Sequence, residues 1–177
     1  MRTTTNAEQL AEIRRRIDRL QAFAQSGPAE SSPRIRRHLD VLRREEASIV
    51  AAAPGAPGCA DEKVGQLKTR LAVAESSLVA DVSDDWTTFA RAVEDELRSW
   101  DTYLERLQTT AATRDADARE RAEAAIADVR SRRIAVHHCL TLAQRKVTRA
   151  WHEQRNHVSA ARDELERKAD ELSAKVE

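Results

Sequence analysis

The feature that most constrains the fold of this chain is the lack of breaks over most of its length. From Gln66 to Glu177 the sequence contains neither a glycine nor a proline. Folds with strands and tight turns need such residues at short intervals, because the turns demand their special backbone geometry. Alanine, glutamate, arginine and leucine dominate instead, a composition typical of long helices and coiled coils. The sequence therefore predicts an all-α protein.

Two apolar stripes with helical spacing occupy the first third of the chain. One runs from Leu10 to Ala24 in steps of three and four residues, and the other runs from Ile35 to Ala53. The sequence QSGPAESSP separates them, and PGAPG after the second is the strongest break in the chain. We therefore expect residues 1–58 to form an N-terminal helical hairpin followed by a Pro/Gly linker.

The rest of the chain predicts longer helices. A third apolar stripe continues to Val82, and the VSDDW sequence after it either starts a fourth helix or continues the third. TTAATRDAD is a weak interruption that predicts a turn near residues 110–116, and from about Ala116 we expect a single helix almost to the end. The chain is acidic before this turn and basic after it, which favours folding back there.

Together these elements predict a long antiparallel helical hairpin, similar to a coiled coil, over residues 59–177. The N-terminal hairpin would pack against part of it, which gives a bundle of four to five helices. A shift of 87 residues carries IDRLQ onto LERLQ and aligns the apolar stripes of the two halves. An internal duplication is one interpretation, and chance agreement between two helical patterns is the other.

The WHEQRNH sequence at residues 151–157 has the residue types of a zinc-protease helix without its spacing. Such a helix needs histidines four residues apart, whereas His152 and His157 are five apart and point about 140° away from each other. The consecutive residues of HHC at 137–139 fan out by about 100° each. The sequence has no phosphate-binding loop and no nucleophile motif. We expect no metal, no cofactor and no enzymatic activity.

Charge and hydropathy argue against several other classes. The net charge is zero and aromatic residues make up 3% of the chain, so nucleic-acid binding is not expected. No segment approaches the roughly 20 apolar residues of a membrane span. The opening MRTTTNAEQL lacks the apolar stretch of a signal peptide, and two cysteines are too few for a disulfide framework. We expect a cytoplasmic protein.

Three tryptophans and two leucines are the candidate anchors. Trp100 and Trp151 occupy apolar seam positions and Trp86 starts a predicted helix, so they are either anchors for a partner protein or local core. Leu165 and Leu172 lie in the distal part of the long helix, which the short N-terminal helices cannot cover. Burying these leucines predicts a homodimer; the alternative is a monomer whose third helix folds back over them.

Residues 93–172 resemble bacterial alanine- and charge-rich coiled-coil hairpin proteins of the stress-response, apolipoprotein-like kind. The resemblance is carried by LRSWDTYLERLQ, DADARERAEAAIADVRSRR and RAWHEQRNHVSAARDELERK. It implies a non-catalytic helical protein and no specific site. We expect a scaffold, adaptor or stress-associated protein that binds a protein partner through helix faces and has no small-molecule substrate. The alternative is a peripheral protein that binds a membrane surface through amphipathic helices.

Overall fold

The computed structural model describes residues 6–26, 32–51, 57–145 and 151–176, and within them every regular element is a helix. These helices are α1 (Asn6–Ser26), α2 (Pro33–Ala51), α3 (Pro57–Val82), α4 (Trp86–Ala111), α5 (Ala116–Gln144) and α6 (Trp151–Val176). The predicted all-α class is confirmed. The described residues form six helices rather than the expected four to five.

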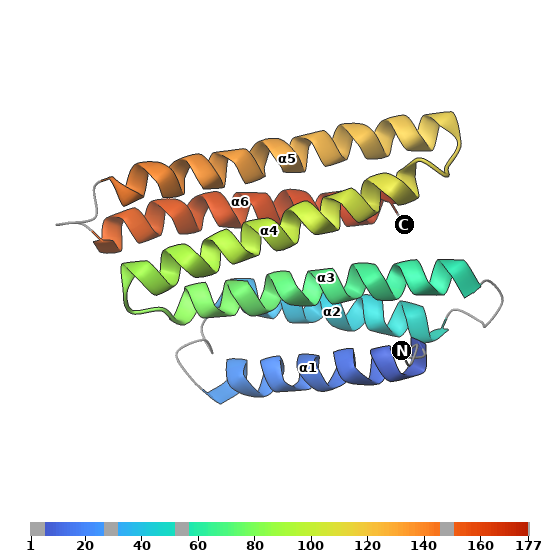
Figure 1. The fold of residues 1–177 in the computed structure, drawn as a ribbon, viewed down its shortest axis with the longest axis horizontal. Coiled ribbons are helices and arrows are strands. Elements are labelled where there is room, and N and C mark those ends of the chain that lie inside the picture. Colours follow the sequence, from blue (N-terminus) through green and yellow to red (C-terminus); the bar gives the residue numbers. More distant parts are fainter. Residues whose placement is uncertain (1–5, 27–31, 52–56, 146–150, 177) are drawn as a thin grey trace, which may run out of the picture.

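Successive helices run in opposite directions, so the bundle has an up-and-down arrangement (Figure 1). α1 and α5 lie at opposite edges of this bundle, and α3 packs closely against α4 between them (Figure 1). Within the described residues no helix has the length and apolar character needed to cross a membrane.

Two apolar cores hold the helices together. The N-terminal core consists of buried residues of α1, α2 and α3: Ile13, Ile17, Leu20, Ala24, Ile35, Leu42, Val64, Leu67, Leu71, Ala74 and Leu78. The C-terminal core gathers buried residues of α4, α5 and α6 around Trp100. α3 takes part in both, because Val73 and Ala80 on another of its faces belong to the C-terminal core.

Aspartate caps fix the starts of α4 and α5. Asp85 accepts a hydrogen bond from the backbone N–H of Thr88 at 2.9 Å, so α4 is a separate helix rather than a continuation of α3. Asp115 accepts from the N–H of Ala118 at 2.8 Å and starts α5. α4 ends at Ala111 and α5 begins at Ala116, which is the interval in which the sequence predicts a turn.

The expectation of one helix from about Ala116 almost to the end is wrong. α5 ends at Gln144 and α6 begins at Trp151, and the two helices pack side by side in opposite directions (Figure 1). A continuous helix over this range would be about 90 Å long and would leave much of its apolar stripe in water. Folding back brings Val158 and Leu165 into the same core as Ile126. Packing therefore decides the break, without a glycine or proline.

The expected exposure of the distal seam is also wrong. Val158, Leu165 and Leu172 are at most 1% exposed within the single chain. Within the described residues this region is covered mainly by α5, with α4 beside it, and α3 adds an ion pair between Arg70 and Asp170 of α6 at 3.0 Å. The argument for a homodimer joined through these leucines therefore no longer holds.

The two halves of the chain have the same helical plan, with three antiparallel helices each. At the 87-residue shift, the buried residues Ile17, Leu42 and Leu78 coincide with Leu104, Val129 and Leu165, which are buried too. The shared register extends over all three helices of each half. The internal duplication stays a prediction that this register favours.

Candidate functional site

Charged side chains from four helices meet in the interior between the two cores. This group, called the buried ion cluster below, consists of Arg34 and His38 of α2, Asp81 of α3, Glu96 of α4, and Arg162 and Glu166 of α6. Most of these side chains are fully or almost fully buried, and Asp81 is the most exposed of them.

Arg162 is the centre of this cluster. Its Nη2 lies 2.7 Å from Oε2 of Glu96, and its Nη1 lies 3.0 Å from Oδ1 of Asp81. The same guanidinium donates a hydrogen bond to the Oγ of Ser77 at 3.0 Å. One arginine of α6 is therefore bonded to both α3 and α4.

Arg34 is the second arginine of the cluster. It lies 2.6 Å from Oδ1 of Asp81 and 3.1 Å from Oε1 of Glu166, while Nε2 of His38 is 3.1 Å from the same Glu166 oxygen. Asp81 thus bridges two arginines, one from each half of the chain. The cluster ties α2 and α3 of the N-terminal half to α4 and α6 of the C-terminal half.

The carboxyl groups of the cluster respond differently to their surroundings. Burial raises the pKa of Glu96, Arg162 opposes this only in part, and the nearby Glu166 adds to the rise. Burial alone would also raise the pKa of Asp81, but Arg162 and Arg34 outweigh it and hold that pKa below its ordinary value. Asp81 is therefore the carboxylate that the arginines stabilise most clearly.

This cluster suits a structural role. Glu96 and Arg162 are 0% exposed, so no substrate in solution can reach the carboxylate with the raised pKa. Burial of an ion pair stabilises a fold little by itself, but removing one partner leaves an uncompensated charge in the interior. The cluster therefore holds the two halves of the chain in their relative position.

Because the pKa of Asp81 is lowered, its contribution to the free energy of unfolding depends on pH. A carboxyl whose folded pKa is depressed contributes stability above its ordinary value of 3.8, and the contribution is lost as the pH falls through the folded pKa. Urea unfolding of Asp81→Asn should therefore show a deficit at neutral pH that shrinks as the pH falls below that value. A deficit independent of pH would contradict the assignment.

The tryptophans predicted as anchors separate into two groups. Trp86 and Trp151 meet at one end of the bundle, where their rings lie 6.3 Å apart and each packs on Phe89. The guanidinium of Arg155 lies over Phe89 and Trp151 and donates to three backbone carbonyl groups at the end of α3. Arg155 therefore caps the end of α3, and the two tryptophans beside it are half-buried.

Trp100 lies in the C-terminal core and is fully buried. Its ring meets Tyr103 edge-on at 5.8 Å, and the guanidinium of Arg70 lies 5.4 Å from its centre. Leu165 and Leu172 belong to the same core. These three predicted anchors are therefore side chains of the folded interior and are not accessible to a partner.

The histidine motifs do not converge. His152 and His157 are exposed, and the nearest carboxylate to His157 is that of Glu153 at 3.9 Å. His137 and His138 are exposed as well. Among the described residues, no group of three metal-ligating side chains is close enough to share an ion.

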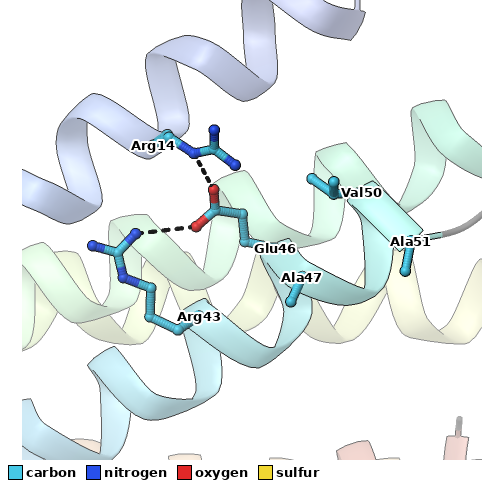
Figure 2. Close-up of a pocket in the computed structure, with 6 residues that line it drawn as sticks. All are labelled: Arg14, Arg43, Glu46, Ala47, Val50 and Ala51. Carbon is cyan, nitrogen blue, oxygen red and sulfur yellow. Dashed lines mark hydrogen bonds and ion pairs between the residues drawn. The ribbon is translucent and has the colours of Figure 1, made fainter.

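Shallow depressions interrupt the surface of the described helices, and two of them lie between neighbouring helices. The first, of about 490 Å³, lies between α1 and α2 (Figure 2) and is lined by Arg14, Arg43, Glu46, Ala47, Val50 and Ala51. Both arginines are already bonded to Glu46, at 2.5 and 3.2 Å. The second, of about 340 Å³, lies between α3 and α4 around Val79 and Ala92. Neither depression concentrates charge of one sign, because acidic and basic groups line each one.

The outward side of α5 differs from the rest of the surface. Seven consecutive positions on this side, called the α5 outer face, are exposed and carry no Asp, Glu, Lys or Arg: Ala124, Ala127, Ser131, Ile134, Ala135, His138 and Leu142. At about 100° per residue they lie within a sector about 100° wide, opposite the buried residues Ile126 and Val129. Ile134 is 62% exposed and Leu142 is 41% exposed.

The other outermost helix provides the contrast. On α1 the exposed side carries charges as far as Arg19, including Glu8, Glu12, Arg15 and Arg19. In a chain in which 34% of residues are charged, an exposed face of this length without charge is a departure from the general pattern. The sequence analysis missed it because only one apolar stripe was sought on each helix.

Comparisons of this chain with family models, with curated proteins and with solved structures give no match. The resemblance of residues 93–172 to coiled-coil hairpin proteins therefore stays an expectation from the sequence, and the candidate sites are those that the structure itself displays.

Proposed function

We propose that this chain is a non-catalytic helical interaction protein, a cytoplasmic scaffold or adaptor, and that it binds a protein partner through the α5 outer face. The observation that carries the proposal is the exposure of Ile134 and Leu142 on a charge-free side of an edge helix. Exposed apolar patches with a polar border are typical of protein interaction sites. The charged side chains of the buried ion cluster form ion pairs with one another and join the helices.

A catalytic role has less support. Glu96, whose pKa is raised, lies out of reach of solvent, and the depression between α1 and α2 is shallow with both of its arginines paired to Glu46. Enzyme sites usually combine a deep pocket with convergent polar groups. The structure supports a rigid helical frame that presents a surface.

Binding of a lipid surface is the alternative function. A membrane-surface helix needs a continuous row of large apolar residues with basic residues beside it. The α5 outer face offers Ile134 and Leu142 as its large apolar residues, and the rest are small or polar. Flotation of the protein with anionic phospholipid vesicles would support the lipid alternative and count against a protein partner.

The experiment that tests the proposal is quantitative affinity capture with matched variants. Ile134→Glu places a charge in the middle of the α5 outer face, and Val50→Glu places one at a similarly exposed position on α2, since Val50 is 60% exposed. We expect Ile134→Glu to lose the captured protein and Val50→Glu to retain it. Retention by both variants would overturn the proposal.

A further inference from the structure

The charges at the two ends of the α5 outer face point to a specific occupant. Asp117 and Glu120 continue the face at its N-terminal end, and Arg145 continues it at its C-terminal end. The backbone of Arg145 is still helical, so its side chain can be placed around the helix axis by the same rotation of about 100° per residue. At about 100° per residue, Glu120, Ser131 and Arg145 fall within about 40° of one another around the helix axis.

Two copies of a charge-free face with an acidic end and a basic end are complementary when they pair in antiparallel orientation, because each acidic end then meets a basic end. We propose that the α5 outer face binds the α5 outer face of a second copy of this chain, in antiparallel orientation about a two-fold axis. This inference rests on the proposed function and names its partner. Isologous two-fold contacts are the commonest way in which identical chains associate.

The register of the pairing follows from the positions of the charges. An axis between Ser131 and Ile134 places Ser131 opposite Ile134 of the second copy and Glu120 opposite Arg145 of the second copy. Each charge pair occurs twice, about 38 Å apart along the helices. In the parallel orientation the acidic ends would meet each other and the basic ends would meet each other, which is unfavourable.

Among the described residues, neither charge is committed to another ion pair. Glu120 and Arg145 are exposed, and neither forms an ion pair within the part of the chain that the structure describes. The small side chains of Ala124 and Ala127 allow two helix backbones to approach closely along the face. Ile134 and Leu142 supply the apolar contact area.

The size of the interface sets the expected affinity. A single pair of helices buries an area at or below the low end of the roughly 1,200–2,000 Å² of stable complexes. We therefore expect a dimer with a dissociation constant of about 1–100 μM, which dilution reverses.

Sedimentation equilibrium of the full chain tests the proposal. The wild-type protein should show a mass that rises from 19.9 kDa towards twice that value across this concentration range. Ile134→Glu, and independently Leu142→Glu, should weaken association at least about 100-fold, because each variant buries two carboxylates at the contact. Val50→Glu should dimerise as the wild type does. Circular dichroism checks that each variant is folded. We expect all of them to fold, because the replaced side chains are exposed.

Charge reversal tests the orientation. Glu120→Arg or Arg145→Glu alone should weaken the dimer about tenfold, because each creates two like-charge pairs in the antiparallel arrangement. The double variant Glu120→Arg/Arg145→Glu should restore the wild-type association, since both pairs are then complementary again. Association that the double variant fails to restore would overturn the antiparallel register.

The outcomes also separate this inference from the proposed function. A wild-type chain that stays at 19.9 kDa, or an Ile134→Glu variant that still dimerises, overturns pairing with a second copy. If the monomeric chain nevertheless captures another protein through Ile134, the proposed function stands without the dimer.

Discussion

Replacing Arg162 by methionine should lower the free energy of unfolding by about 3–5 kcal/mol, because the change leaves Glu96 and Asp81 buried without their shared cation. Methionine keeps much of the side-chain volume, so the expected loss reflects charge rather than a cavity. Chemical unfolding monitored by circular dichroism measures it. A second change, Glu96→Gln in the Arg162→Met background, should recover part of the loss by removing one uncompensated carboxylate.

The control for this variant is a surface arginine on the same helix. Arg167 pairs with Glu164 and Glu171 on the exposed side of α6. Arg167→Met should leave the free energy of unfolding almost unchanged, since exposed ion pairs contribute little. Equal effects of the two methionine variants would show that the buried ion cluster does not hold the helices together.

Replacing Trp100 by alanine should lower the free energy of unfolding by about 3–5 kcal/mol, because the largest fully buried side chain of the C-terminal core is lost and a cavity remains. Trp100→Phe should cost clearly less. It keeps an aromatic ring against Tyr103, and it removes an indole N–H that has no hydrogen-bond partner among the described residues.

The half-buried Trp86 provides the comparison. Trp86→Ala should destabilise the fold less than Trp100→Ala does, because its ring is partly in solvent at the end of the bundle. A Trp100→Ala variant with an unchanged unfolding curve would contradict the placement of Trp100 in the core.

The apolar spacing of the sequence was sufficient to predict the all-α class and many of the buried residues. The stripe from Ile13 to Ala24 is buried in the structure, and so are Trp100 and Leu165, which belong to two later stripes. The break between Gln144 and Trp151 could not be predicted in the same way. Local propensity allows a helix to continue there, and the return of α6 onto α5 and α4 is a property of the packed bundle.

The buried ion cluster was missed for a different reason. The charged residues were used only to place the turn near residues 110–116 and to judge nucleic-acid binding, whereas Arg162 continues the core spacing from Val158 to Leu165 in steps of four and three residues. Glu96 likewise falls between Val93 and Trp100 in steps of three and four. A charged residue in the register of an apolar seam was the available signal. Its partner cannot be identified from sequence, because helices far apart in the chain supply it.

Because the two sides of α3 belong to different cores, the molecule cannot be divided simply at a linker. Leu67 and Leu71 on one side of this helix complete one core, while Val73 and Ala80 on the other side complete the second. The border between the two cores therefore runs lengthwise along α3. A cut between α3 and α4 would leave the C-terminal core without Val73 and Ala80, so we expect neither half to be a complete folding unit by itself.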